Sequence, residues 1–547
     1  MHTTVVNYTN TEGTYSEQQV REIRISYENQ IKEHKDEIYK LKNNVIVFQN
    51  KYLEIKEHYD LLIYRRYMRS AEKLMFDDKQ PLLFTPEETP EGIAVEEEPQ
   101  AEKAEVKSYI RTKRGRKPID SKIPRVDRVI DIPEEQKICA CGAKLSRIGE
   151  ETSEKLEIIK PKIYVDRIIR PKYACGSCEG TEEEEKPAVR IASVEPSIIP
   201  RSIASASLLS TIFTHKFEDH LPYYRQEKQF QRIGVEISRQ DMSNWQQHVY
   251  KTLNPLFELM KEDVKSGPVM QMDETGVRVM SGVKNSPEKS EGAKADIHGG
   301  WMWLARGGPL EGKVIWFEYH ESRAGKHAKE FLEGYSGYLQ TDGFGGYDCA
   351  VKDRPDIIQV GCFAHARRKF FEASKASNVN KSAEEGIKHI RKLYDIENKY
   401  RKEKLAEDKF LQQRKEAALP VLEEFKAWLL ERVDEVSPTT LMGKAIQYSL
   451  NQWDKMSRYL ESPHLTPDNN ACENAIRPFV LGRKNWMFCG SPEGAKSSCA
   501  LYSLIETARQ SHISPALYLR ILFEKAPYAS TPQDWKKLLP WNILKDN

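Results

Sequence analysis

The sequence predicts a multidomain protein with a long N-terminal helix and an α/β domain. Three observations predict this class. The chain has 547 residues, which is too long for one domain and fits three or four. Apolar residues near the N-terminus recur at heptad spacing, as in a long helix. After Gly267, short apolar runs separated by turn residues replace that pattern, as expected for the strands of a sheet.

The overall composition is that of a soluble, mostly folded chain. Charged residues make up 30% of it, hydrophobic residues 39%, and the net charge of +2 identifies no partner. The N-terminus shows no basic start followed by an apolar run, so we expect no signal peptide. No stretch of about 18 apolar residues occurs, so we expect no membrane partner and a cytoplasmic location.

Residues 1–80 are predicted to form a coiled-coil helix through which the chain makes a homo-oligomer. No proline or glycine occurs between Val20 and Leu74, and apolar or aromatic side chains follow a 3–4–3–4 spacing. The alternative is a long helix that packs on its own protein. The seam positions are Tyr27, Ile31, His34, Ile38, Leu41, Val45, Phe48, Tyr52, Ile55, Tyr59 and Leu62.

An acidic and a basic segment follow. Residues 81–106 are rich in proline and glutamate and are predicted to be a flexible linker. Residues 107–130 are strongly basic and contain a segment similar to an AT-hook, in which arginines on either side of a glycine can enter a narrow minor groove. Short matches of this kind also occur by chance, and phosphate binding alone is the broader prediction. The candidate DNA-binding residues are Arg114, Gly115, Arg116 and Lys117.

Residues 131–182 are predicted to be a small, β-rich zinc domain. The nine cysteines of the chain fall in uneven clusters, which favours metal binding over disulfides. A C-x-C pair is followed after 33 residues by a C-x-x-C pair, with a strand-like segment between them. The alternative is a set of unrelated thiols, and the short first pair weakens the zinc geometry. The candidate ligands are Cys139, Cys141, Cys175 and Cys178.

Residues 190–265 are predicted to be a helical, helix-turn-helix-like DNA-binding region. One helix is expected before a turn at Gly234, and a second helix is expected to open at Ser238. Asp241 follows Ser238 by three residues, which is the spacing of a capping box. An ordinary helical hairpin would have the same pattern.

Residues 266–365 and 466–510 are predicted to form a ribonuclease-H-like α/β core. Five short apolar runs occur in the first part, the third leads into a helix-like segment, and the fifth runs into a helix. Residues 366–465 are read as an all-helical insertion, and residues 511–547 as a C-terminal element.

Two acids are placed where strands are expected to end. Asp273 ends the run "PVMQMD" before a Thr-Gly turn, and Asp342 ends "GYLQTD" before Gly343. Carboxylates at neighbouring strand ends can share divalent cations. Each acid alone is weak support, because aspartate before glycine is common in turns.

A third carboxylate, Glu473, is predicted on a short helix laid across these strand ends. Thr466 and Pro467 are expected to start that helix as N-cap and first residue, and Pro478 is expected to end or kink it. The alternative is a surface pair of Glu473 with Arg477, stabilising by only about 0.2–0.5 kcal/mol.

Four segments together resemble the bacterial insertion-sequence-66 transposases, which belong to the DDE, ribonuclease-H-like superfamily. The segments are "MDETGVRV", "LQTDGFGGYD", "GCFAHARRKF" and the stretch from "DNNACENAIRPF" to "LIETAR". The similarity extends in order over nearly the whole chain. It implies that Asp273, Asp342 and Glu473 are the catalytic triad, and that Cys362 and His365 form an accessory C-x-x-H element. The chain departs from the family pattern in its C-x-C pair and in Asn474, where many relatives have arginine.

The resemblance implies metal-dependent phosphoryl transfer on DNA. Two Mg²⁺ ions, which Mn²⁺ can replace, would be held by the triad while the enzyme cuts the element's ends and joins each 3′-OH to target DNA. Arg477, Arg483 and Lys484 are predicted to hold phosphates, and Trp486 is predicted to stack on an unpaired base. We expect action on bacterial nucleoid DNA, with accessory transposition proteins as further partners. The alternatives are a non-catalytic DNA-binding regulator and a metal-dependent nuclease that does not join strands.

Overall fold

The computed structural model describes residues 16–67, 163–174, 189–280, 297–309, 313–376 and 381–543. The chain divides into two units, one of residues 1–89 and 195–547 and the other of residues 90–194. The basic segment at 107–130 and all four candidate zinc ligands lie outside the described residues. None of the described helices is both long and apolar enough to cross a membrane.

The larger unit begins with α1, Glu17–Tyr67, a single helix of 51 residues. Most apolar side chains of its heptad positions are exposed to solvent, including Ile38 at 52% and Leu41 at 57%. The last turns differ, because Leu61 is buried in the core of the helical insertion. There the Glu57 carboxylate also accepts a hydrogen bond of 2.8 Å from the backbone N–H of Leu441. Only the end of α1 is therefore covered by the rest of the unit.

The smaller unit contains a short antiparallel ribbon. Strand β1, Lys172–Ala174, pairs with β2, Val189–Ile191, so that Tyr173 lies opposite Arg190. The first of these strands lies where the sequence between the cysteine pairs alternates in a strand-like way.

A set of helices precedes the sheet. Gly234 adopts a φ of +80° in the turn between α3 and α4, a conformation that favours glycine. Ser238 caps α4, and both hydrogen bonds of the predicted capping box with Asp241 are present. The buried Gln246 of α4 donates to the hydroxyls of Ser497 and Ser498, which fixes this helix against that later segment of the chain. The helices are α2 (Ala206–Phe217), α3 (Tyr223–Arg232), α4 (Arg239–Thr252) and α5 (Asn254–Asp263).

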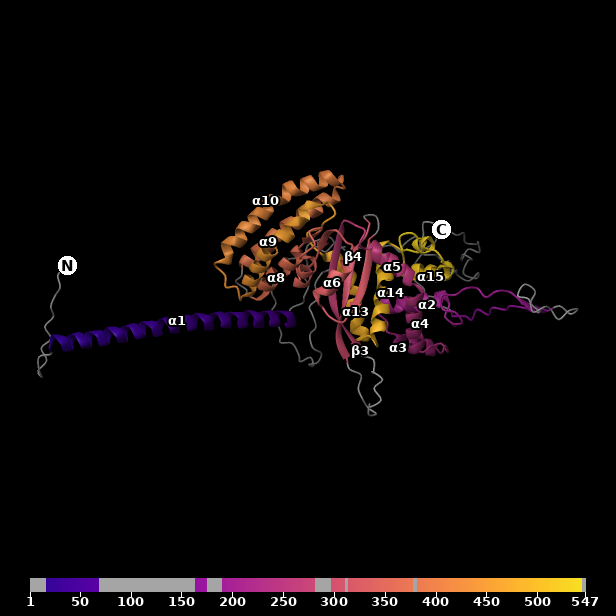
Figure 1. Ribbon diagram of the computed structural model, residues 1–547, viewed down its shortest axis with the longest axis horizontal. Helices are drawn as coiled ribbons and strands as arrows, with labels where there is room; N and C mark the ends of the chain where they lie inside the picture. Colours follow the sequence, from indigo (N-terminus) through magenta and orange to yellow (C-terminus); the bar gives the residue numbers. More distant parts are fainter. Residues whose placement is uncertain are drawn as a thin grey trace, which may run out of the picture. The chain divides into compact units, whose positions relative to one another are not determined.

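The central sheet is mixed and has the strand order β5-β4-β3-β6-β7. Figure 1 labels two of its strands, β3 and β4. Strand β4 is antiparallel to both of its neighbours, β3 and β5, while β6 runs parallel to both β3 and β7. The strands are β3 (Val269–Met280), β4 (Ile297–Gly307), β5 (Val314–His320), β6 (Gly337–Gln340) and β7 (Ile357–Val360).

Two expectations about this region are wrong. Asp273 does not end a strand, because β3 continues through Thr275 and Gly276, and Gly276 pairs with Trp301 of β4. A long antiparallel partner thus supplies ladder bonds that override the local turn signal. The segment between β6 and β7 is also not a simple turn. It forms helix α7, Gly345–Val351, in addition to α6 (Gly325–Phe331) and α8 (Phe363–Ala376).

Residues 366–465 are mainly helical and have a core of their own. Aromatic rings of α8, α9 and α10 pack together in it, with Phe425 centred 6.2 Å from Phe370 and 6.0 Å from Trp428. These helices lie together in Figure 1. The elements after α8 are α9 (Lys381–Lys402), α10 (Glu407–Val433), α11 (Leu441–Asn451), α12 (Trp453–Ser457) and a 3₁₀ turn (Arg458–Glu461).

Helix α13, Asn470–Trp486, begins later than predicted and does not end at Pro478. Asn469 rather than Thr466 is its N-cap, because the Thr466 hydroxyl donates to the backbone O of Asp468 and holds the chain in a turn before the helix. Pro478 lies inside the helix, which continues to Trp486. The proline is itself buried, so tertiary packing offsets the missing helical hydrogen bond.

Helix α14, Pro492–Gln510, covers the sheet beside α13 and protects the edge strand β5. The Thr507 hydroxyl accepts from the N–H of Ile315 (3.0 Å), and the Ser503 hydroxyl accepts from the N–H of Phe317 (2.8 Å). Side chains thus satisfy edge N–H groups that could otherwise pair with another chain. The chain continues with α15 (Pro515–Lys525), a 3₁₀ turn (Ala526–Tyr528) and α16 (Pro532–Lys537).

Candidate active site

Two of the predicted acids come from adjacent parallel strands. The register of β3 and β6 pairs Gln271 with Gln340, and Asp273 and Asp342 each lie two residues further along the chain. Parallel strands carry equivalent positions to the same level of a sheet. The sheet therefore places the two carboxylates as neighbours, although one lies within a strand and the other just beyond one.

Asp342 is held by the turn that follows β6. Its Oδ1 accepts a hydrogen bond of 2.9 Å from the N–H of Phe344, and its backbone O accepts one of 2.7 Å from the hydroxyl of Tyr448. Tyr448 belongs to α11, so the helical insertion contacts the residue directly. The intervening Gly343 has a φ of +87°, a backbone conformation that glycine adopts without strain.

The third acid, Glu473, lies in the first turn of α13. The start of this helix is fastened at two points by the fully buried Asn469. Its amide Nδ2 donates to the backbone O of Met272 (3.0 Å), and its backbone N–H donates to the Sγ of Cys362 (3.3 Å). The first bond joins α13 to β3 at the residue before Asp273, so it brings Glu473 to the part of the sheet that carries the other acids.

The three acids interact electrostatically. Burial raises the pKa of Asp273 well above its ordinary value, and the charges of Glu473, Glu274 and Asp342 raise it further. Burial also raises the pKa of Glu473 to about 7; Asp342 adds to this shift and the nearby Arg368 opposes it. Acids that raise one another's pKa are easily ionised together only when a cation compensates their charge.

Glu473 is not the exposed partner of a surface ion pair. Its side chain is 13% exposed and faces α8, with Oε1 at 3.7 Å from His365 Nδ1 and Oε2 at 3.5 Å from an Arg368 guanidinium nitrogen. Over the described ranges, one group of three possible ligand residues has donor atoms within 4.8 Å of one another: Cys362, His365 and Glu473. Asp273, Asp342 and Glu473 do not form such a group there.

The cationic residues of α13 serve different purposes. Arg477 is half-buried, and its charge lowers the pKa of Glu473. Arg483 donates to the hydroxyl of Thr275 (2.9 Å) and to the backbone O of Gly276, so it fastens the last turn of α13 to β3. Lys484 is exposed, as a phosphate-binding side chain needs to be.

Trp486 was predicted to stack on a base, but its ring packs within the protein. Its ring meets Phe479 edge-to-face, with centroids 5.5 Å apart, and it packs against the main hydrophobic core. This packing gives the indole a structural contact at the end of α13.

A partnered acid beside Asp273 was missed by the sequence analysis. Glu274 is 8% exposed, and its carboxylate accepts from the Tyr347 hydroxyl (2.6 Å) and from Nε of Arg323 (2.7 Å). The Arg323 guanidinium also lies 3.8 Å from the centroid of the Phe344 ring, in the turn that holds Asp342. The adjacent acids in "MDE" were a possible signal, but their partners are remote in sequence.

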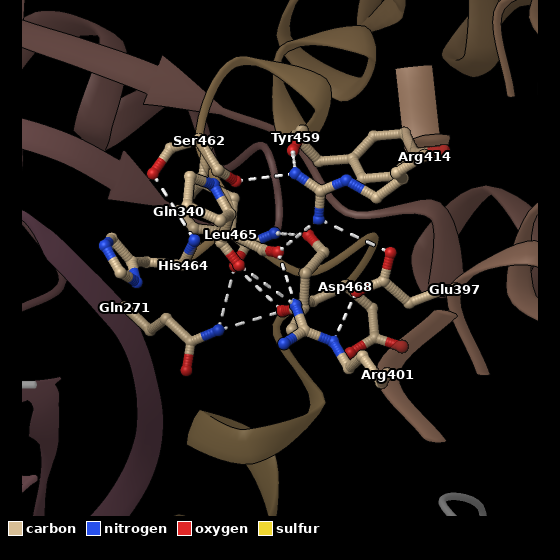
Figure 2. Close-up of polar contacts among 12 residues, drawn as sticks. Gln271, Gln340, Glu397, Arg401, Arg414, Tyr459, Ser462, His464, Leu465 and Asp468 are labelled. Atoms are coloured by element: carbon tan, nitrogen blue, oxygen red, sulfur yellow. Dashed lines mark hydrogen bonds and ion pairs between the residues drawn. The ribbon is translucent and has the colours of Figure 1, made fainter. Parts of the chain in front are cut away.

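A second network lies where the helical insertion meets the segment before α13 (Figure 2). Arg414 of α10 is fully buried. Its guanidinium donates to the backbone O of Tyr459 (2.7 Å), Ser462 (2.6 Å) and Leu465 (3.0 Å), and lies 3.4 Å from the carboxylate of Glu397. The insertion thereby holds residues 459–465 in place.

The same segment is tied to the strands that carry the two aspartates. The side-chain amide of Gln340 donates to the backbone O of Thr466 (2.7 Å). Gln271 donates to the Oε1 of Gln340 (2.8 Å), and the backbone O of Asp468 lies 3.4 Å from the same amide nitrogen (Figure 2). The chain segment that leads to Glu473 is therefore held by the helical insertion on one side and by β3 and β6 on the other.

Comparisons with known proteins identify the family of the chain. The family model "Transposase IS66 family" matches residues 201–497, which include all three acids. The chain belongs to the IS66 transposase family. The model for the zinc-finger binding domain of transposase IS66 matches residues 136–179 and indicates a structural zinc, and the IS66 C-terminal element matches residues 503–541.

Similar proteins occur in Sinorhizobium fredii. The uncharacterized protein y4jD is 31% identical over 432 residues, which cover 78% of this chain and 81% of that protein. The uncharacterized protein y4qI is 30% identical over 447 residues, 80% of this chain and 79% of that protein. The similarity to these two proteins thus extends over most of the chain.

Proposed function

We propose that this member of the IS66 transposase family is a DDE-type enzyme that cuts insertion-sequence ends and joins their 3′-OH groups to target DNA. The observation that carries the proposal is the placement of three acids on neighbouring elements: Asp273 and Asp342 at one level of parallel strands, and Glu473 on a helix fastened to β3 at Met272. The sheet order β5-β4-β3-β6-β7 supports a ribonuclease-H-like core.

The chemistry of the three acids suits divalent cations such as Mg²⁺ or Mn²⁺. They supply the charged oxygens that hard cations prefer, and burial together with the charges of neighbouring acids raises the pKa of Asp273 and Glu473. Asp273, Asp342 and Glu473 would hold the ions. When bound, such ions act as Lewis acids that activate the attacking oxygen and stabilise the leaving one.

The chain's own residues then position DNA and the third acid. Lys484, which is exposed, and Arg477, which lies one helical turn after Glu473, would contact the phosphates beside the bond to be cut. Asn469 holds the start of α13 against β3 and so keeps Glu473 near the aspartates. We assign Arg483 and Trp486 mainly to holding α13 on the sheet, because both make contacts within the protein.

The remaining segments would bind DNA and assemble the chain. Cys139, Cys141, Cys175 and Cys178 would hold the structural zinc, and Arg114 to Lys117 would contact DNA phosphates. The exposed apolar positions of α1 would form a coiled coil with a second copy. Ile38→Asp should dissociate that assembly in sedimentation experiments, whereas Lys40→Asp, outside the seam, should not.

A cleavage-and-joining assay tests the function directly. The full chain is incubated with end-containing DNA and Mg²⁺, and the same DNA is used in a gel-shift measurement. The wild type should cut and join. Glu473→Gln should bind but do neither, and the exposed acid variant Glu493→Gln, at a side chain 66% exposed, should behave as wild type.

Other outcomes separate the alternatives. Cutting without joining would identify a nuclease, and binding without either reaction would identify a regulator. Normal cutting by Glu473→Gln would remove Glu473 from the proposed triad.

A further inference from the structure

The turn between β7 and α8 brings a thiol and an imidazole to Glu473. Cys362 directly precedes α8, His365 is the third residue of that helix, and Glu473 reaches them from the first turn of α13. The donor atoms of these side chains lie within 4.8 Å of one another. A C-x-x-H sequence at a helix start and a carboxylate more than a hundred positions later thus converge on one point.

Two of these donor atoms are left unsatisfied. His365 Nδ1 and Glu473 Oε1 face each other at 3.7 Å, which is too long for a hydrogen bond. Both atoms are buried, and neither has a hydrogen-bond partner in the part of the chain that the structure describes. A buried polar atom without a partner destabilises the folded state, and a cation between the two atoms would satisfy both.

The thiol is compatible with a bound cation. Cys362 is fully buried, and its Sγ accepts a hydrogen bond of 3.3 Å from the N–H of Asn469. Backbone N–H groups commonly support metal ligands in this way, and a thiolate has further lone pairs to offer. The bond to Asn469 also couples any ion held by Cys362 to the start of α13.

We propose that Cys362, His365 and Glu473 bind one thiophilic transition-metal ion, with Zn²⁺ as the expected ion. Sulfur, imidazole nitrogen and carboxylate oxygen together suit Zn²⁺, whereas Mg²⁺ prefers oxygen ligands alone. Three protein ligands leave a fourth position for water or another small oxygen ligand. This ion is distinct from the cations of the proposed cleavage reaction but shares the ligand Glu473 with them, and its effect is to fix the Glu473 carboxylate through Oε1.

Zinc content of the purified full chain tests this site without DNA or Mg²⁺. Zinc per chain is measured in the wild type, in Cys362→Ser and in His365→Ala. Each variant should hold one equivalent less than the wild type. The matched control is Cys349→Ser, at an exposed cysteine in α7, which should keep the wild-type content. Equal zinc in the wild type and in both site variants would overturn the proposal.

A second experiment uses Co²⁺ to distinguish metal bound at this site from metal bound by the four-cysteine domain. It also distinguishes loss of the site from loss of the fold. Cys175→Ser disables the predicted zinc finger and leaves Cys362 intact. That chain, loaded with Co²⁺, should show a thiolate-to-cobalt charge-transfer band, which a further Cys362→Ser change should abolish while the circular dichroism spectrum is unchanged. No such band in the Cys175→Ser chain would also overturn the proposal. Metal content is read without cleavage, so a failure of the proposed function would leave this result standing.

Discussion

Two buried acids of this protein, Glu397 and Glu473, differ in how their charge is compensated. The Glu397 side chain is 7% exposed, and Arg401 and Arg414 both contact its carboxylate at hydrogen-bond distance (Figure 2). The Glu473 side chain is 13% exposed, and its cationic neighbours His365 and Arg368 lie at 3.7 and 3.5 Å. Glu397 is thus paired within the protein, while Glu473 lies among other acids with one oxygen unsatisfied.

The difference shows which buried charge is structural. A buried ion pair whose remaining donors are also bonded holds segments together, as Arg414 holds residues 459–465. A cluster of acids with raised pKa values and too few cations is costly unless something else binds to it, which is typical of a functional site. The network at Glu397 stabilises the segment that leads to the less stable site at Glu473.

The largest expected effect comes from breaking the paired network. Arg414→Met removes a fully buried cation, leaves Glu397 with Arg401 alone and frees three backbone carbonyls. The free energy of unfolding, measured by chemical denaturation, should fall by about 3–5 kcal/mol. Lys392→Met breaks an exposed pair with Glu424 and should leave stability nearly unchanged. A similarly small loss for Arg414→Met would show that the ion pairs of Glu397 do not stabilise the fold.

The opposite outcome is expected at the proposed catalytic triad, Asp273, Asp342 and Glu473. Asp342→Asn should reduce cleavage of end-containing DNA by roughly 10²–10³-fold, because one charged oxygen ligand is lost where charge develops in the reaction. Its stability should not decrease, because a repulsive charge is removed from Asp273. Cleavage rates in Mg²⁺ and thermal unfolding of the same preparation check both parts. A large loss of stability with normal cleavage would show that Asp342 is structural rather than catalytic.

The pH dependence of stability sharpens the same comparison. The pKa of Glu473 is raised from 4.5 to about 7 in the folded chain, so the folded state binds a proton more tightly than the unfolded state. Glu473 therefore stabilises the folded state in full below about pH 4.5, and this stabilisation is lost as the pH rises through about 7. The free energy of unfolding falls by about 3 kcal/mol at most over this range. The difference in unfolding free energy between the wild type and Glu473→Gln, measured without divalent ions, should follow this curve. A flat difference from pH 4 to 8 would contradict the raised pKa.

A smaller effect is expected beside the candidate active site. Tyr347→Phe removes the hydroxyl that donates to Oε2 of Glu274 at 2.6 Å and leaves the carboxylate with Arg323. The unfolding free energy should fall by about 1.5–3 kcal/mol, the usual range for a hydrogen bond to a charged group. Tyr528→Phe, at an exposed tyrosine, is the control. No measurable loss would indicate that Arg323 alone compensates Glu274.

The sequence by itself determined the features that depend on short stretches of chain. The heptad spacing predicted a long helix, the Ser238–Asp241 spacing predicted a capping box, and the acids at 273, 342 and 473 were recognised from their motifs. Each of these signals resides in residues close together in the chain, where helix periodicity, capping and turn preferences act.

Only the tertiary structure decided how these parts meet. Asp273 lies inside β3 because pairing with β4 overrides the Thr-Gly turn signal, and α13 begins at Asn470 because Asn469 is bonded to Met272 and Cys362. The partners of Glu397 and Glu473 come from helices remote in sequence, and no local pattern indicates which acid will be paired. Pairing and burial depend on the distances between elements, and those distances are set by packing of the whole unit rather than by the neighbouring residues.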